Sequence, residues 1–460
     1  MESLIQVAYL FASIAFIIAI KLLNSPSTAR LGNLIGALGM LGGIVATLFY
    51  KSIIRYEWIL IGLVLGSLVG AWLALKVKMT AMPQMVALLN GFGGAASALV
   101  ASAEAAKELL TNTLSFLSAF SLTTIGLSIV IGSVTFTGSL IAFAKLQELI
   151  SGRPFLLPAH HYQSLLLFLL SLGATAYFSL TKGEIAGMYV LSIASFLLGF
   201  WITLPIGGAD MPVIVAFLNS LSGLAAAATG FVLNNYLLII AGTLVGASGL
   251  ILTQIMSRAM NRSLWNVLFG AVGAEVSSGG SGDRTVRSTT AEDVALMLSY
   301  AKEVVIVPGY GMAVAQAQHA VKKLVDALSE KGVETRFAIH PVAGRMPGHM
   351  NVLLAEADIP YEKLYEMERI NPDFPQVDVA LVIGANDVVN PAARKDQNSP
   401  LYGMPILDVD KAKTVVVLKR SMNPGFAGVE NELFYQPNTY MLFGDARKSL
   451  ESLTQALKEV

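Results

Sequence analysis

The sequence predicts a multi-pass α-helical membrane domain of about nine transmembrane helices, followed by an α/β domain with a mostly parallel sheet. Two observations predict this fold class. Residues 1–260 contain only 18 of the 62 acidic and basic side chains. Residues 261–460 contain the other 44, which is the density of an ordinary soluble domain. The hydrophobic pattern also changes, from stretches that could cross a bilayer to short β-branched runs that alternate with helical stretches.

The composition also excludes several classes of protein. With 54% hydrophobic residues the chain is not disordered, and without cysteine it has neither a disulfide scaffold nor a cysteine-ligated metal. The formal net charge of zero argues against a nucleic-acid partner. That neutrality is a cancellation, because residues 1–260 have a net charge of +4 and the remainder −4. We expect no metal site.

Nine apolar stretches are long enough to span a membrane, which takes about 20 residues of helix because each backbone polar group must be satisfied within the segment. The first stretch is expected to remain as an anchor. Glu2 stands where a signal peptide has basic residues, and no small-residue cleavage site precedes Lys21. The stretches lie near 5–23, 32–50, 58–75, 83–101, 124–146, 163–180, 185–204, 212–233 and 236–257.

Nine crossings place the two ends of the chain on opposite sides of the membrane, and the loop charges predict which side is which. Eight basic residues share the side of the C-terminal domain: Lys21, Arg30, Lys76, Lys78, Lys145, Arg153, Arg258 and Arg262. Four lie on the other side: Lys51, Arg55, Lys107 and Lys182. The excess predicts a cytoplasmic C-terminal domain and an N-terminus outside. A miscount of one helix, most easily near 102–123, would reverse this orientation.

An internal similarity at a constant offset of 129 residues links two parts of the membrane domain. Small residues and helix-starting prolines recur in any membrane bundle. A single register kept over 25 residues favours two related helix pairs, as in many transporters. The offset contains four crossings, so the copies should run in the same direction. The matches are Gly70/Gly199, Trp72/Trp201, Met82-Pro83/Met211-Pro212, Val86-Ala87/Val215-Ala216, Leu89-Asn90/Leu218-Asn219 and Gly94/Gly223.

Each copy contains one asparagine at a similar depth, Asn90 and Asn219. An amide in hydrocarbon must face protein, water or another helix, so the pair is either structural or part of a hydrogen-bonded relay along a solvated path. We favour the relay. Asp210 precedes a helix start, where a carboxylate either caps the helix or has a coupling role. Hydroxyls that could extend the relay are Ser133, Thr135, Thr137, Ser139 and Ser248.

Titratable groups are scarce in the membrane domain. The five histidines, His160, His161, His319, His340 and His349, lie outside the predicted spans, and no acidic or basic residue lies deep inside one. A proton pathway would therefore need water or a titratable residue from another subunit.

The run Ser277–Gly282 is rich in glycine and serine, which predicts a flexible tether. We therefore divide the chain into a transmembrane domain (1–262), a linker (263–290) and an α/β domain (291–460). Expected strands lie at 304–307, 336–340, 379–383, 414–418 and 440–443, and expected helices at 312–329, 349–357 and 445–459. The alternation of strands and helices is typical of a parallel sheet covered on both faces.

The first expected strand leads through Gly309, Tyr310 and Gly311 into a helix. That context is required for a dinucleotide fingerprint, in which one glycine turns the chain and the second lets the backbone approach a pyrophosphate. The fingerprint predicts a Rossmann-like domain. Val314 occupies the position where glycine or alanine is usual, so the helix is expected to approach less closely.

The second strand lacks the acidic residue that would hold the ribose 2′-hydroxyl of NAD. Lys419-Arg420-Ser421, directly after a strand, could instead hold a 2′-phosphate, the alternative being ordinary surface charge. Ligands bind at the carboxyl ends of parallel strands. Three further strand ends are 343–349, 384–387 and 423–428.

These segments resemble the NADP(H)-binding domain of proton-translocating NAD(P) transhydrogenase, beta subunit. The similarity covers 309–318, His-Pro-Val-Ala-Gly-Arg at 340–345, Gly-Ala-Asn-Asp at 384–387, Lys-Arg-Ser-Met at 419–422 and Gly-Asp at 444–445. In the membrane half it covers Thr-Phe-Thr-Gly-Ser at 135–139 and Gly-Gly-Ala-Asp-Met-Pro at 207–212. Nearly the whole chain is included.

The resemblance implies that Tyr310 and 311–314 line the cofactor, which lies in a reversed orientation. It implies that Arg345 and Asp387 act near the nicotinamide and phosphates, and that 419–421 bind the 2′-phosphate. The full expected cofactor set is Gly309, Tyr310, Gly311, Met312, Ala313, Val314, Ala343, Gly344, Arg345, Gly384, Ala385, Asn386, Asp387, Lys419, Arg420, Ser421, Gly425, Ala427, Gly444 and Asp445. The expected proton path and coupling set is Asn90, Ser139, Asp210 and Asn219.

The resemblance further implies direct hydride transfer between NAD(H) on an alpha-type partner subunit and NADP(H) bound here, coupled to proton movement across a bacterial plasma (inner) membrane. No side chain is expected to act as acid or base on the nicotinamide. Some family members have histidine where this chain has Asn90, so the partner is expected to add membrane helices and a titratable group. A dimer of the hetero-oligomer is expected.

Two rival functions stay open on the residues alone. One is an ion or solute transporter or channel that NADP(H) regulates through the soluble domain, because duplication and polar helices suit it equally well. The other is a binding module without transport, for which nine crossings are excessive.

Overall fold

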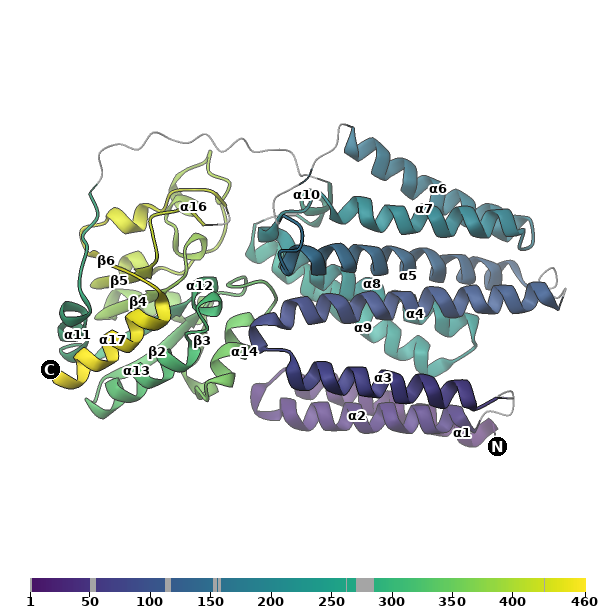
Figure 1. The fold of residues 1–460 in the computed structure, drawn as a ribbon, viewed down its shortest axis with the longest axis horizontal. Helices are drawn as coiled ribbons and strands as arrows, with labels where there is room; N and C mark the ends of the chain where they lie inside the picture. Colours follow the sequence, from purple (N-terminus) through teal and green to yellow (C-terminus); the bar gives the residue numbers. More distant parts are fainter. Residues whose placement is uncertain are drawn as a thin grey trace. The chain divides into compact units, whose positions relative to one another are not determined.

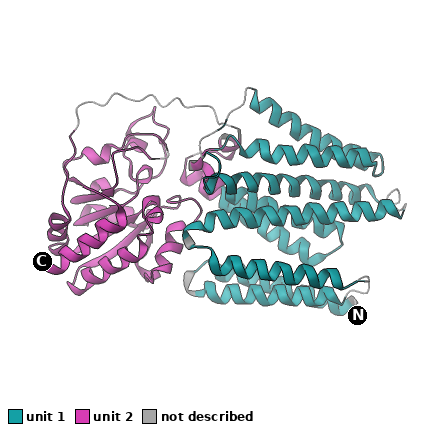
Figure 2. Cartoon of the chain, viewed as in Figure 1, with its two compact units in different colours: residues 1–206, 214–253 teal, residues 207–213, 254–460 magenta. Residues whose placement is uncertain are grey.

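The computed structural model describes residues 2–49, 55–111, 117–151, 155, 159–261, 263–269, 285–425 and 427–460. The chain divides into two compact units (Figure 2). Unit 1 comprises Met1–Ile206 and Ile214–Thr253, and unit 2 comprises Gly207–Val213 and Gln254–Val460. The expected tether at 277–282 lies outside the described residues.

The described part of the chain contains nine helices that are long and apolar enough to cross a membrane, as expected (Figure 1). Their ends extend beyond the predicted spans in several places. The helices are α1 (Glu2–Leu23), α2 (Pro26–Leu48), α3 (Glu57–Lys76), α4 (Met82–Leu110), α5 (Ala119–Leu146), α6 (His160–Leu180), α7 (Ile185–Thr203), α8 (Met211–Val232) and α9 (Tyr236–Ala259).

Local structure repeats at the same offset of 129 residues as the sequence. A 3₁₀ turn, η1 (Met79–Ala81), leads directly into α4, and a second, η3 (Gly208–Asp210), leads directly into α8. Each long helix begins at the methionine of a Met-Pro pair, and proline suits the first turn because its missing N–H needs no partner there. Four helices separate the starts of α4 and α8, so the two copies run the same way.

Close glycine contacts join the helices of each copy. A Cβ on Gly94 of α4 would lie 2.7 Å from the carbonyl oxygen of Gly132 on α5. A Cβ on Gly223 of α8 would lie 2.4 Å from the backbone nitrogen of Gly246 on α9. Small residues at such points let helix backbones approach closely in a membrane bundle. The matched glycines therefore share a packing role.

Unit 2 contains a six-stranded sheet in the order β3-β2-β1-β4-β5-β6, and every strand pair in it is parallel (Figure 1). This confirms the Rossmann-like class. The strands are β1 (Glu303–Pro308), β2 (Glu334–Ile339), β3 (Leu364–Glu366), β4 (Val379–Ile383), β5 (Thr414–Lys419) and β6 (Thr439–Phe443).

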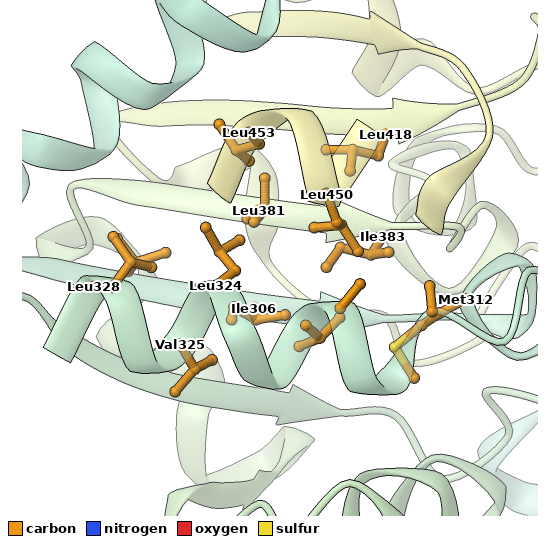
Figure 3. Packing of buried hydrophobic residues seen from close by; sticks show 14 of the residues in the cluster. Ile306, Met312, Leu324, Val325, Leu328, Leu381, Ile383, Leu418, Leu450 and Leu453 are labelled. Atoms are coloured by element: carbon orange, nitrogen blue, oxygen red, sulfur yellow. The ribbon is translucent and has the colours of Figure 1, made fainter. Parts of the chain in front are cut away.

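Alternate residues of β1 pack on opposite faces of the sheet because strand side chains alternate. Val304 and Ile306 pack with α11, α13, α14 and α17, a cluster seen from close by in Figure 3. Val305 and Val307 pack with α15, η5 and η8 on the other face. The covering elements are α11 (Ala291–Ser299), α13 (Gln318–Glu330), α14 (His349–Glu356), α15 (Met367–Ile370), η5 (Asn371–Gln376), η8 (Glu432–Tyr435) and α17 (Ala446–Glu459).

One expected helix is wrong as a continuous element. The stretch 312–329 divides into α12 (Tyr310–Val314) and α13, because Gln316 between them has a positive φ of 49°. The five expected strands are present, and the structure adds β3 at the sheet edge. The remaining elements are α10 (Leu264–Phe269), η4 (Tyr361–Lys363), η6 (Asp387–Val389), α16 (Ala392–Lys395) and η7 (Val409–Lys411).

Candidate functional site

The candidate site lies at the carboxyl ends of β1 and β4, the neighbouring strands at which the strand order reverses direction. Ligands bind outside such a switch point in open parallel sheets. The backbone N–H of Gly309 donates to the carbonyl oxygen of Ile383 at 2.9 Å, and that of Gly311 donates to the carbonyl oxygen of Gly384 at 2.9 Å. The turn after β1 is therefore bonded to the end of β4.

The glycines are required here by contact between backbones. A Cβ on Gly309 would lie 2.3 Å from the Cα of Ala385, and one on Gly311 would lie 2.7 Å from the Cα of Gly384. Gly384 itself has a φ of +67°, a conformation that favours glycine. The expected reason for the second fingerprint glycine was the approach of a pyrophosphate. In this structure the space beside Gly311 is filled by the end of β4.

The short helix α12 follows this turn. Met312 and Ala313 are buried, whereas Val314 is 50% exposed. Because Val314 points away from the core, its branched side chain does not push the helix off the sheet. The expected looser approach at Val314 is therefore wrong.

The loop after β2 lies against the same turn. The Arg345 guanidinium lies over the Tyr310 ring, 4.5 Å from its centroid, which is a cation–π geometry. Gly344 has a φ of +113°, and a Cβ there would lie 2.5 Å from Nδ1 of His349. That Nδ1 also accepts the backbone N–H of Arg345 at 3.1 Å. Ala343 is buried beside them, so three predicted residues of this loop lie together.

Sequence reasoning missed the role of His349 in this loop. Burial and the positive charge of Arg345 lower the pKa of His349 to about 4, so the ring is neutral near pH 7. With Nδ1 as acceptor, the proton is on Nε2. Among the described residues Nε2 has no hydrogen-bond partner. Only its position after a glycine-rich loop could have indicated it.

The end of β4 is joined to the loop after β5. Asp387 accepts the backbone N–H of Ala427 at 3.0 Å, and a Cβ on Gly425 would lie 2.4 Å from Oδ1 of Asp387. Asn386 accepts from Nδ2 of Asn431 at 3.0 Å. Its own Nδ2 is buried without an acceptor in the part of the chain that the structure describes. The structure thus brings Asp387 together with Gly425 and Ala427, and it adds Asn431 beside Asn386, which the sequence did not indicate.

Lys419 ends β5 and is partly buried. Its Nζ donates to the carbonyl oxygen of Asn423 and lies 5.0 Å from the centroid of the Phe434 ring. Burial lowers the pKa of Lys419 below its ordinary value, and the negative charge of Asp387 opposes that shift. This ammonium is therefore fixed by its surroundings, unlike that of a solvated surface lysine.

Arg420 and Ser421 are held differently. The Arg420 guanidinium forms an exposed ion pair with Asp445 at 3.2 Å, and Asp445 also caps the start of α17 through the backbone N–H of Lys448. Gly444 donates its backbone N–H to the carbonyl oxygen of Lys419 at 3.0 Å. Ser421 accepts a weak bond, at 3.4 Å, from the backbone N–H of Asn423. The ends of β5 and β6 therefore lie together, and Arg420 already has an anionic neighbour.

The membrane candidates do not form one continuous chain of described hydrogen bonds. Asn90 donates to the backbone carbonyl of Val215 on α8 at 3.3 Å. Ser139 is fully buried, faces Gly91 of α4, and has no described partner for its hydroxyl. The backbone carbonyl of Asn219 accepts from Ser222 at 2.7 Å. Asn90 thus joins the two copies, as an amide in a bundle should.

Most hydroxyls expected to extend a relay bond within their own helix. Thr135, Thr137 and Ser248 donate to backbone carbonyls three or four residues earlier. A different cluster, missed from the sequence, crosses the bundle: Ser128 of α5 and Thr229 of α8 are 2.7 Å apart, and both lie within 3.5 Å of the carbonyl oxygen of Ser97 on α4. Asp210, 9% exposed, ends η3 directly before α8 begins.

Comparisons with known proteins show the family to which the chain belongs. The family model described as "NAD(P) transhydrogenase beta subunit" matches residues 5–456. The chain belongs to this family. Two curated proteins named "NAD(P) transhydrogenase subunit beta", one from Rhodospirillum rubrum and one from a named strain of that species, are each 50% identical to it over 462 aligned positions. The match covers 99% of this chain and 99% of each relative.

Two expectations about titratable groups in unit 1 of this transhydrogenase-family chain are wrong. His160 and His161 lie in the first turn of α6, inside a candidate span, and His160 is 5% exposed. Lys145, expected at a loop, lies in the last turn of α5 with 3% exposed. Its Nζ donates to the carbonyl oxygens of Leu204 and Ile206.

The residues at the switch point fit the nicotinamide dinucleotide that the family name implies. The buried Nδ2 of Asn386 and Nε2 of His349 are donors without described acceptors. A partly buried ammonium, Lys419, stands two strands from the β1 turn. Orphaned donors and a fixed cation at the carboxyl ends of the same sheet suit a ligand rich in phosphate and amide oxygens.

Proposed function

We propose that this chain is the membrane and NADP(H)-binding subunit of a proton-translocating transhydrogenase, which transfers hydride directly between NAD(H) on a partner subunit and NADP(H) bound here. The observation that best supports it is the switch-point site, with its glycine contacts, orphaned donors and Lys419, in a chain of this family. Residues 1–262 would form the proton-translocating domain, 263–290 a linker and 291–460 the cofactor domain.

Within the cofactor domain, Lys419, Arg420 and Ser421 would hold the 2′-phosphate. Arg420 would exchange its exposed pair with Asp445 for a phosphate, which costs little because exposed ion pairs contribute about 0–1 kcal/mol. Arg345 and Tyr310 would flank the nicotinamide end, and Asp387 with Gly425 and Ala427 would close the phosphate side. The absence of an acid from residues 336–340, at the carboxyl end of β2, supports NADP(H) over NAD(H).

When bound, the nicotinamide ring supplies the hydride chemistry itself. The protein needs only to align the two C4 atoms at about 3–3.5 Å and to exclude water. No side chain is therefore assigned as an acid or base. The switch-point residues would bind and orient the cofactor and exclude water.

The membrane unit would supply the driving force. At roughly 2.3 kcal/mol per charge per 100 mV, a proton-motive force of about 180 mV supplies on the order of 4 kcal/mol, close to a thousandfold in the NADPH ratio. Asn90, Ser139 and Asn219 would line the proton path, and Asp210 would contribute to coupling. Coupling requires that proton binding change the affinity for NADP(H).

We further propose an alpha-type partner that binds NAD(H), supplies extra membrane helices with a titratable group, and forms a dimer of the hetero-oligomer. The loop charges support a cytoplasmic cofactor domain and an outside N-terminus in a bacterial plasma membrane.

The test compares the full chain alone with the chain assembled with its partner in sealed vesicles. Alone, it should bind NADPH yet fail to reduce NADP⁺ with NADH. Assembled, it should transfer hydride at a rate that changes when an uncoupler is added. Hydride transfer by the chain alone, or a rate insensitive to the uncoupler, would refute the proposal. Solute flux gated by NADPH without hydride transfer would instead favour the regulated transporter.

A further inference from the structure

Lys145 is unlike the other lysines of the helical unit. It is 3% exposed at the end of α5. The other lysines of this unit that the structure describes are exposed: Lys21, Lys76, Lys78, Lys107 and Lys182. Lysines at a membrane edge usually extend the ammonium to water along an apolar stem. Lys145 instead directs its charge into protein.

The partners of Lys145 are backbone carbonyls. Its Nζ donates to the oxygen of Ile206 at 2.7 Å and to that of Leu204, the residue that caps the end of α7. The last carbonyls of a helix lack partners within the helix and form the negative end of its dipole, so a cation is favoured there. No carboxylate pairs with this ammonium among the described residues.

The contact lies where the chain passes from one unit to the other. Ile206 is the last residue of unit 1 before Gly207–Val213, which belongs to unit 2. A neighbouring bond supports the same end of the bundle: Nε2 of Gln84, in the first turn of α4, donates to the carbonyl oxygen of Leu146 at 3.1 Å. The end of α5 is thus bonded to the start of α4 and to the end of α7.

Packing alone does not explain a cation at this position. A charge enclosed without a carboxylate is costly, and a methionine of similar length would fill the same volume without that cost. An ionisable residue enclosed in a membrane bundle is better explained by a function that needs the charge.

We propose that Lys145 is a positioning residue for coupling. Its ammonium holds the end of α7 and thereby fixes the segment that leads into Gly207–Asp210. The inference rests on the proposed function, because it assigns to Lys145 the task of transmitting events in the membrane unit to the segment before Asp210.

The test uses the assembled enzyme in sealed vesicles and compares Lys145→Met, Lys145→Arg and the control Lys76→Met, which removes an exposed charge from the last turn of α3. The measured quantity is the ratio of NADP⁺ reduction rates by NADH before and after an uncoupler is added. Since Lys145→Met removes hydrogen bonds from a charged donor, we expect it to lower this ratio by up to roughly tenfold. A ratio of unity would mean that the uncoupler no longer affects the rate. Lys145→Arg should retain most of the ratio, and Lys76→Met should match the wild type.

NADPH binding by each variant checks folding and should stay within about twofold of the wild type, as the site lies in the other unit. If Lys145→Met does not bind NADPH, Lys145→Gln replaces it, with the same loss of ratio expected. A ratio in Lys145→Met or Lys145→Gln equal to that of Lys76→Met overturns the inference. So does a loss in Lys145→Arg as large as in Lys145→Met. A wild type without hydride transfer overturns the proposed function instead.

Discussion

Substituting Gly384 by alanine tests the backbone contact on which the switch-point site is built. Gly384 has a φ of +67°, and its new Cβ would lie 2.5 Å from the Cα of Gly311. Gly332 is a matched control, because its φ is +77° but a Cβ there meets nothing within 4 Å. The left-handed conformation costs an alanine about 1–2 kcal/mol at either position. Only Gly384 adds overpacking, which costs about 1–3 kcal/mol.

Both substitutions stiffen the unfolded chain equally, so the difference between them isolates the contact. We expect Gly384→Ala to lower the free energy of unfolding of the α/β domain by about 1–3 kcal/mol more than Gly332→Ala. Hydrogen exchange of β1 and β4 peptides, measured by mass spectrometry in the full chain, reports this domain separately from the membrane helices. Equal losses of protection in the two variants would refute the close approach of the β1 turn to β4.

Three further predictions follow from the structure. Lys419→Met should weaken NADPH binding by about 10–100-fold, since a hydrogen bond to a charged group contributes about 1.5–3 kcal/mol. The control Lys413→Met removes a lysine near the opposite end of β5, where it pairs with Asp378, and should leave NADPH affinity unchanged. Equal NADPH affinities of the two variants, measured by calorimetry, would contradict the assignment of Lys419. Burial lowers the pKa values of His340 and His349 from 6.5 to about 4 in the folded chain. The unfolded chain therefore binds more protons between these values, and stability present above pH 6.5 should fall as the pH drops toward 4, by on the order of 3 kcal/mol for each histidine. Calorimetry should therefore give a lower Tm at pH 5 than at pH 7. Equal Tm values would show that the two rings are not buried in their neutral form. Gly94→Ala should lower the thermal stability of the helical unit in detergent, because its Cβ would meet Gly132. Gly93→Ala should not, as its nearest contact is at 3.8 Å, and similar melting of the two variants would exclude the glycine contact.

Hydropathy predicted the nine long apolar helices of the described residues better than it predicted where those helices end. The fourth span was expected at 83–101, but α4 continues to Leu110. Its final turns contain Glu104 and Lys107, which pair at 2.9 Å across one turn of helix. Charged residues end an apolar stretch and still stabilise a helix. The repeat was the stronger signal, because the 3₁₀ turns before α4 and α8, which were not predicted from the sequence, lie at the same offset.

In the α/β domain the β-branched runs predicted five strands, since each is buried on both faces of the sheet. Strand β3 was missed because it is a three-residue edge strand with little burial. The break after α12 was missed because Gln316, with its positive φ, is not a glycine and gives no local signal.

The fingerprint glycines show most clearly what a sequence motif leaves out. The motif places Gly309 and Gly311 between a strand and a helix, and ligand approach is the usual reason for them. The reason found here is another loop, 384–385, which lies 75 residues later in the sequence and fills the same space. No spacing within the motif could indicate that partner. Because Gly311 and Gly384 each exclude a Cβ on the other, the two segments form one rigid platform, and the donors of Asn386 are fixed relative to the β1 turn before any ligand binds.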